Sequence, residues 1–305
     1  MMKFLELVRY KNLMIIALTQ MLIRYGLILP YDVPHALSDI QFGLLVLTTL
    51  LIAAGGYVIN DYFDIRVDRI NKGDGVLVGF AIKRRTAMVL HIVLSAGGLL
   101  TGGYLCFAVG MWKLVGIFIL SIGLLWFYST HFKKQFLVGN LVISFLTAVS
   151  VLLVGVFELI PVLSPEYFDT TRGVLVVMSG YALFAWVSTL LREIVKDLED
   201  IDGDEAMGYH TLVIEFGRQH ARYAALIGGV LLLGGVLYAS NIILEGKPWH
   251  LLYTAVGVII PLLWFLWGLR KDSPNYALLT RILKFVMLMG AVSMIAFQWL
   301  SKYGL

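Results

Sequence analysis

Two acidic clusters with the same internal spacing are the most informative residues of this 305-residue chain. The first extends from Asn60 to Asp68 and the second from Lys196 to Asp204, and both place aspartates at i, i+3 and i+7. At about 100° per residue, these positions share one face of a helix. Like charges stacked in this way repel each other, so we expect a cation between them. Ligand sets made only of oxygen atoms suit Mg²⁺.

A single charged run beside an apolar segment is usually a solvated loop. Here the same three offsets occur twice, which simple solvation does not require. We therefore interpret the two clusters together as a paired metal site.

The rest of the chain has the composition of a membrane protein. Hydrophobic residues make up 59% and charged residues 14%, whereas a soluble domain has about 25% charged residues. The mean hydropathy is +0.85. Apolar runs of about 20 residues are long enough to cross the hydrocarbon core, and they occur at about 13–31, 39–59, 85–110, 113–130, 137–160, 173–191, 222–243, 250–269 and 282–300. We predict an all-α, multi-pass integral membrane protein with nine transmembrane helices around a central cavity.

Charge distribution predicts the orientation of these helices. Most of the 24 lysines and arginines fall in the N-terminal segment or in the loops after the second, fourth, sixth and eighth runs. The opposite side has Lys113, Arg172, Lys247 and Lys302, and Arg24 lies within the membrane. By the positive-inside rule, the N-terminus and both acidic clusters are cytoplasmic and the C-terminus is on the other side. The net charge of +4 thus reflects topology. Nucleic-acid binding would require a basic domain outside the bilayer, and the sequence predicts none.

The two clusters also suggest an internal duplication. Four apolar runs separate them, and Val76–Val78 and Arg84–Ala87 align approximately with Leu212–Ile214 and Arg218–Ala221. We predict a single domain over 1–305, built from two parallel four-helix repeats at about 13–130 and 137–269 and a ninth helix at about 282–300. The acidic clusters would then face each other across the cavity.

With these motifs in place, the chain resembles the UbiA superfamily of intramembrane prenyltransferases over nearly its full length. The resemblance rests on Asn60–Asp68, which matches the family pattern NDxxDxxxD, and on Asp200–Asp204 within the segment that begins at Arg192. It implies an enzyme that transfers an isoprenyl group and releases diphosphate, with Mg²⁺, in two ions, as cofactor. The donor, a lipophilic acceptor and the bilayer are the implied partners, with no obligatory protein partner.

The resemblance also implies roles for individual residues. Asn60, Asp64 and Asp68 on one side, and Asp200 and Asp204 on the other, would hold Mg²⁺ bridging the diphosphate. Asp61 and Asp197 would be further ligands or would orient the others. Lys196 stands where the first cluster has Asn60, and we expect it to contact a phosphate oxygen. We count Asp64, Asp68, Asp200, Asp204 and Lys196 as catalytic.

Further diphosphate-binding residues are implied in the loops. The candidates are Arg84, Arg85, Tyr128, Lys133, Lys134, Arg192 and Lys196. The segment Lys133–Asn140 resembles the family stretch that opens the fifth helix. The chain departs from the family after the first motif, where Asn71–Gly75 lacks the usual prolines and arginine, so we expect a more flexible loop there and phosphate contacts shifted to Arg84 and Arg85.

The chemistry expected is ionisation of an allylic diphosphate, followed by attack of a nucleophile on C1 and proton transfer to a nearby carboxylate. Aromatic side chains can shield the allylic cation, and the candidates are Tyr57, Tyr62, Tyr128, Tyr181 and Trp186. The amino-acid sequences of both motifs are most similar to those of the digeranylgeranylglyceryl phosphate synthase group. That similarity implies geranylgeranyl diphosphate as donor and geranylgeranylglyceryl phosphate as acceptor. An aromatic acceptor such as 4-hydroxybenzoate is the alternative.

Cation transport is a more distant alternative. It would favour carboxylates at the membrane midplane, whereas these lie at the ends of apolar runs, beside arginines and lysines. Arg24, within the first run, either meets an acceptor anion or pairs structurally, for example with Asp32. His91 and His131 are interpreted as packing or interfacial residues rather than metal ligands.

Overall fold

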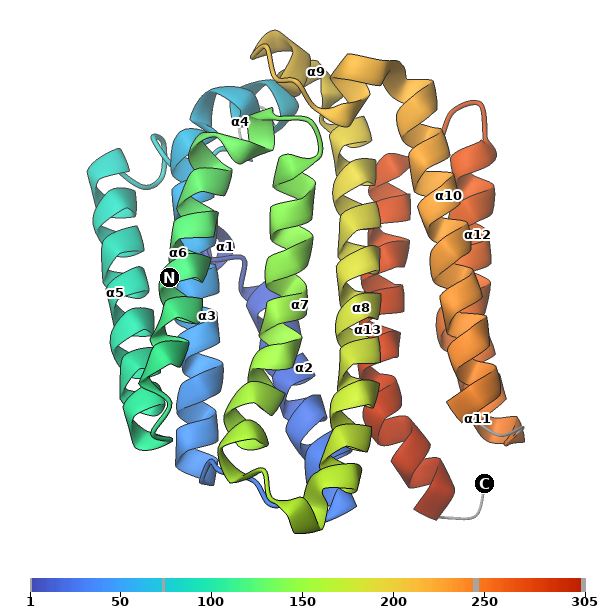
Figure 1. The fold of residues 1–305 in the computed structure, drawn as a ribbon. Helices are drawn as coiled ribbons and strands as arrows, with labels where there is room; N and C mark the ends of the chain where they lie inside the picture. The colour runs from blue at the N-terminus through green and yellow to red at the C-terminus, as the bar shows by residue number, and fades with distance from the viewer. Residues whose placement is uncertain (1, 73–74, 244–246, 303–305) are drawn as a thin grey trace.

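The computed structural model describes residues 2–72, 75–243 and 247–302, and these form a bundle of helices (Figure 1). Within the described residues there is no β-strand, only an isolated bridge between Val78 and Ile82. The helices are α1 (Met2–Leu7), α2 (Tyr10–Ile23), α3 (Asp39–Phe63), α4 (Ile65–Lys72), α5 (Arg84–Ala108), α6 (Val115–Thr130), α7 (Val138–Glu158), α8 (Phe168–Glu199), α9 (Ile201–Ala206), α10 (Leu212–Ile243), α11 (Pro248–Thr254), α12 (Ile260–Arg270) and α13 (Tyr276–Lys302).

Nine helical segments of the described chain are long and apolar enough to cross a membrane, which confirms the predicted number. The clearest difference from the sequence prediction is the sixth segment, which extends over Pro165–Glu199 rather than 173–191. The residues from Arg192 to Glu199 are therefore a direct continuation of a membrane helix. Residues 73 and 74, in the loop that departs from the family pattern, lie outside the described residues.

Helix α8 connects the two hydrophobic cores of the bundle. Its first half contributes Val174 and Met178 to a core shared with α2, α3 and α7. Its second half contributes Leu191 and Val195 to a core shared with α10, α12 and α13. Helices α4 and α9 lie at the same end of the bundle, and α13 ends at the opposite one (Figure 1). The acidic clusters are therefore presented at one end, as the parallel-repeat prediction requires, while the repeat itself stays a prediction.

Arg24 is buried in a polar cluster at the end of the bundle away from α4 and α9. Its Nη1 donates to Oε1 of Glu158 at 2.6 Å, and its Nη2 donates to Oδ1 of Asp39 at 3.0 Å and to the carbonyl of Leu37 at 3.1 Å. The other carboxylate oxygen of Glu158 accepts from the Leu37 amide at 3.1 Å. Of the two alternatives for Arg24, the structure supports the structural one, with Glu158 and Asp39 as partners in place of Asp32. The cluster ties the turn that follows α2 to α3 and α7.

Glu158→Leu should lower the stability of the protein, because it leaves the guanidinium of Arg24 buried without its closest carboxylate. Removing one partner of a buried ion pair costs about 3–5 kcal/mol, whereas replacing both partners by apolar residues is often nearly neutral. The measurement is the thermal unfolding midpoint of the purified protein in detergent. The double variant Arg24→Met/Glu158→Leu is the control and should recover most of the loss. A single variant as stable as the wild type would contradict this account.

Candidate active site

Each acidic cluster is placed at the end of a long helix, where the chain turns a corner. Asp64 follows α3 with φ −87° and ψ 3°, and Asp200 follows α8 with φ −92° and ψ 8°. Since ψ is about −42° in an α-helix, the prediction of one continuous helix face is wrong for both clusters. The hydrogen bonds around the corner also match: Asp64 N to Asn60 O (2.9 Å), Asp68 N to Asp64 O (2.8 Å), Asp200 N to Lys196 O (2.9 Å) and Asp204 N to Asp200 O (3.2 Å).

The corner divides each cluster between a long helix and a short one. The first two polar residues lie on the last turn of α3 or α8, and the last aspartate lies on α4 or α9. Helices α4 and α9 pack against each other. The two clusters are therefore brought together by a contact between the short helices that carry Asp68 and Asp204.

One cavity of about 630 Å³ reaches both clusters and continues into the apolar interior of the bundle. Its polar end includes Asn60, Asp61, Asp68, Lys196 and Asp200. Away from the clusters it is lined by apolar side chains of α3, α6 and α7, among them Ile52, Ile117, Phe118, Leu125, Leu146 and Leu153. Such a shape suits a ligand with an anionic head and a long apolar tail.

Basic or amide side chains contact several of the carboxylates. Asp61 accepts from Arg9 at 2.9 Å, and Asp64 is ion-paired with Lys133. Asp197 accepts from Nδ2 of Asn140 at 2.8 Å, and Asp200 lies 3.7 Å from Lys196. These contacts offset part of the repulsion that the spacing of the aspartates predicts.

Asp204 shows that the negative charge is not fully compensated. Burial, and then repulsion from Asp200, raises the pKa of the Asp204 carboxyl to about 7, and Asp64 of the other cluster adds to this effect. Burial, followed by Asp64, Asp204 and Asp68, also raises the pKa of Tyr209. Carboxylates of both clusters therefore act on the same groups, Asp204 and Tyr209. Their combined negative potential attracts a cation.

Comparison with known proteins decides the family. A model of the UbiA prenyltransferase family matches residues 14–296. The chain belongs to this family. Digeranylgeranylglyceryl phosphate synthase of Methanothermobacter thermautotrophicus is 35% identical over 226 residues, which are 73% of this chain and 70% of that protein. The enzyme of the same name from Thermococcus kodakarensis aligns over 64% of its own length, at 31% identity.

Solved structures show the same fold. A structure of digeranylgeranylglyceryl phosphate synthase in membranes covers 96% of this chain and 98% of its own, with a TM-score of 0.65 and 24% identity. A UbiA homolog from Archaeoglobus fulgidus bound to GPP and Mg²⁺ covers 96% and 99%, with a TM-score of 0.60 and 15% identity. The predicted family and its all-helical membrane fold are thereby confirmed.

The residues of this UbiA-family protein fit a metal ion that is coordinated partly by the protein and partly by a bound phosphate. The donors are carboxylate and amide oxygens, which Mg²⁺ prefers, and Oδ1 of Asn60 is buried with no hydrogen-bond partner. Within the described residues, no group of three or more His, Cys, Asp or Glu side chains is close enough together to hold an ion without further ligands. Substrate oxygens would therefore have to complete the coordination.

The stretch resembling the family's fifth-helix opening positions one contact on each cluster. Lys133 reaches Asp64, and Asn140, at the start of α7, reaches Asp197. Burial lowers the pKa of Lys133, although Asp64 opposes this effect. A Cβ atom at Gly139 would lie 2.8 Å from Cα of Lys133, so the glycine permits the close approach of α7 to the Lys133 loop.

The remaining predicted cations are distributed unequally. Arg192 and Lys196 line the large cavity. Lys134 is exposed and lies 5.9 Å from the ring centroid of Tyr209. Arg84 and Arg85 are also exposed and do not line the cavity, and Arg84 lies 4.9 Å from the ring centroid of Tyr62 instead. The expected shift of phosphate contacts to these two arginines stays a prediction.

The aromatic and histidine candidates also separate. Tyr57 and Tyr128 line the large cavity, Tyr181 lines a smaller one, and Tyr62 and Trp186 line neither. His91 is buried with Nδ1 2.9 Å from the carbonyl of Gly55, while His131 is exposed with Nδ1 2.7 Å from Oγ1 of Thr130. The packing and interfacial interpretations of the two histidines are consistent with these contacts.

Sequence reasoning missed Arg9, Glu193 and Lys284, which all line the large cavity. Arg9 has a left-handed backbone conformation with φ 51°. Its guanidinium forms an ion pair with Asp61 and lies 5.0 Å from the ring centroid of Tyr57. In the sequence, Arg9 lies just before the first span and looks like any basic residue that flanks a membrane helix on its cytoplasmic side. Nothing in the spacing of Lys284 marks it as a cavity residue.

Gly139→Ala should reduce both stability and prenyltransferase activity, because the added methyl displaces the backbone that holds Lys133 against Asp64. Overpacking of this kind costs about 1–3 kcal/mol. The measurements are the thermal midpoint and the initial rate of prenyl transfer. Gly123→Ala on α6 is the matched control, since its Cβ would meet no atom within 4 Å. Equal effects of the two substitutions would show that the close approach at Gly139 is unimportant.

Proposed function

We propose that the protein transfers a geranylgeranyl group from geranylgeranyl diphosphate to geranylgeranylglyceryl phosphate, with Mg²⁺ as cofactor. The observation that carries the proposal is the single cavity that connects both aspartate clusters to an apolar interior. The relatives named digeranylgeranylglyceryl phosphate synthase support this donor and acceptor. The A. fulgidus homolog bound to GPP and Mg²⁺ supports a prenyl diphosphate with a divalent ion.

In this proposal the diphosphate lies between the two clusters. Asn60, Asp64, Asp68, Asp200 and Asp204 would hold Mg²⁺, in two ions, and Asp61 and Asp197 would orient their neighbours from their contacts with Arg9 and Asn140. When bound, Mg²⁺ acts as a Lewis acid that stabilises the charge on the leaving diphosphate. Asp64 would release Lys133 when it binds the metal. The ammonium groups of Lys133 and Lys196 can then each donate a hydrogen bond to a diphosphate oxygen.

The aromatic residues beside the clusters favour ionisation of the donor. The bond between C1 and the bridging oxygen breaks, and the electron pair leaves with the diphosphate. The rings of Tyr57 and Tyr128 line the cavity beside the clusters, where they can stabilise the allylic cation and exclude water. The acceptor hydroxyl oxygen then forms the new bond to C1, and its proton passes to a carboxylate of the clusters.

We further propose that the end of the bundle with α4 and α9 faces the cytoplasm. This orientation rests on the distribution of lysines and arginines along the chain. The aspartates lie at helix ends rather than mid-span, which favours a phosphate substrate over a transported cation. The C-terminal end of α13 would then lie on the opposite side (Figure 1).

Asp64→Asn and Asp200→Asn should each abolish prenyl transfer, because each removes a charge needed to hold Mg²⁺ and diphosphate. The measurement is transfer of radiolabelled prenyl groups by purified protein, with and without excess EDTA. Asp202→Asn is the matched control, since its side chain lies in the second cluster but is 84% exposed. Full activity of both first variants, or unchanged turnover in EDTA, would refute the metal site.

The wild type should consume geranylgeranylglyceryl phosphate much faster than 4-hydroxybenzoate or a dihydroxynaphthoate. The physical reason is that a phosphate head requires cations in the cavity lining, which Arg9, Arg192, Lys196 and Lys284 supply. Parallel assays with geranylgeranyl diphosphate as donor, with products identified by mass, make the comparison. Preferential turnover of an aromatic acid would overturn the acceptor and leave the prenyltransferase assignment intact.

A further inference from the structure

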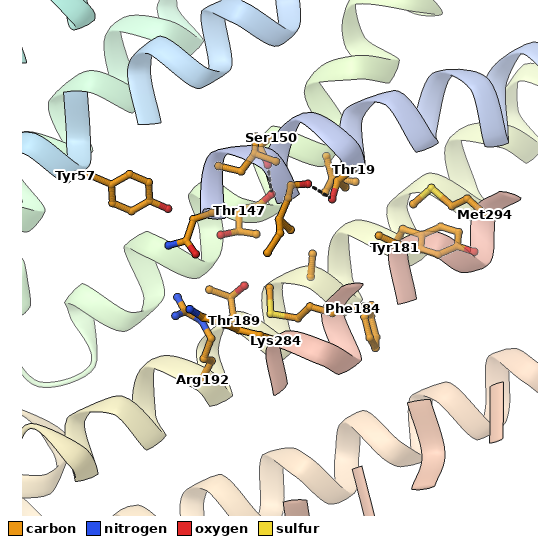
Figure 2. Close-up of a pocket in the computed structure, with 17 residues that line it drawn as sticks. Thr19, Tyr57, Thr147, Ser150, Tyr181, Phe184, Thr189, Arg192, Lys284 and Met294 are labelled. Carbon is orange, nitrogen blue, oxygen red and sulfur yellow. Dashed lines mark hydrogen bonds between the residues drawn. The ribbon is translucent and has the colours of Figure 1, made fainter. Parts of the chain in front are cut away.

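A second, smaller cavity meets the first at a shared polar junction. It has a volume of about 130 Å³ and lies among α2, α7, α8 and α13. Both cavities are lined by Asn12, Ile16, Tyr57, Thr147, Ser150, Arg192 and Lys284. Figure 2 shows Arg192, Thr189 and Lys284 gathered in one part of this small cavity, with Tyr181 and Met294 in another. The small cavity therefore has a cationic part and a largely apolar remainder.

Four cations lie at or near the junction, and three of them, Arg9, Arg192 and Lys196, each have a nearby carboxylate. Lys284 is within electrostatic reach of Arg192, Arg9 and Lys196, and the carboxylates Glu193 and Glu199 interact with it. Glu193 is buried at 7% exposure and ion-paired with Arg192. Cations held this close repel one another, so the arrangement favours an additional anion.

Two hydroxyl groups beside these cations have no partner. Oγ1 of Thr189 lies one turn before Arg192 on α8, and Oγ1 of Thr280 lies one turn before Lys284 on α13. Both atoms are buried without a hydrogen bond. Thr189 lines the small cavity, and Thr280 lines the large one. A buried hydroxyl without a partner is costly, which indicates that a ligand supplies the missing hydrogen bonds.

We propose that Arg192 and Lys284, with Thr189 and Thr280, bind the phosphate of the acceptor lipid, and that the small cavity takes the part of the acceptor next to its head. The inference rests on the proposed function and deepens it. It also changes the role of Arg192, which the family resemblance linked to the diphosphate. The donor diphosphate stays with the aspartates and their metal, while a phosphate bound without metal requires direct cations.

Lys284→Gln tests this assignment. We expect the KM for geranylgeranylglyceryl phosphate to rise about tenfold to a hundredfold, in line with a lost charge-assisted hydrogen bond, while the KM for geranylgeranyl diphosphate stays within about twofold. Geranylgeranylglycerol, which lacks the phosphate, is the second acceptor. The wild type should prefer the phosphorylated acceptor, and Lys284→Gln should lose most of that preference. Lys284→Arg, which keeps the charge, should restore it.

Arg281→Gln is the matched control, because Arg281 is an exposed cation on the same end of α13 and lines neither cavity. It should leave both KM values unchanged. A rise in the KM for the donor alone, or an unchanged acceptor preference in Lys284→Gln, would overturn the inference while the proposed function stands. A wild type that does not use geranylgeranylglyceryl phosphate would instead refute the proposed function, and the inference with it.

Discussion

Repulsion between partly buried carboxylates is the constraint on which the arrangement of this site depends. The aspartates of both clusters lie at the ends of membrane helices, close enough for Asp64 and Asp200 to act on Asp204. Protein cations and amides compensate part of this charge from four separate elements: the N-terminal segment, the loop before α7, the start of α7 itself, and α8. Compensation thus comes from several separate elements and is only partial, since the pKa of the Asp204 carboxyl stays raised.

The corners at Asp64 and Asp200 explain how two separate clusters meet in one cavity. A straight helix would carry all members of a cluster along one line, and the last aspartate would project beyond the bundle. Because each chain segment turns at the middle aspartate, α4 and α9 fold over the end of the bundle and pack on each other. The last aspartate of each cluster is thereby returned toward the partner cluster. The nearly equal backbone angles at the two corners support a common local origin for both motifs.

How much could be predicted depended on the range of the interaction involved. The nine membrane segments follow from local hydropathy, and the aspartates from a spacing repeated within a few residues, so both were readable in the sequence. The corners were not, because i, i+3 and i+7 spacing fits an ideal helix and carries no sign of a change in ψ. The partners of Arg24 and the cavity positions of Arg9 and Lys284 depend on contacts between distant helices, 134 residues apart for Arg24 and Glu158. No local pattern specifies such pairs.

Arg24, Arg192 and Lys284 show how the same kind of charge serves different purposes at different places in the bundle. Arg24 donates from both Nη atoms to Glu158, Asp39 and a backbone carbonyl, and it is buried among them, although its Nε has no hydrogen-bond partner. Arg192 is ion-paired with Glu193, which also acts on Lys284, and both cations line the two cavities. Arg24, which pairs with two carboxylates and lines neither cavity, stabilises the fold. Arg192 and Lys284, which line both cavities beside unpartnered hydroxyls, favour an anion instead. Ion pairing and access to a cavity, rather than residue type, separate the structural arginine from the cations assigned to substrate.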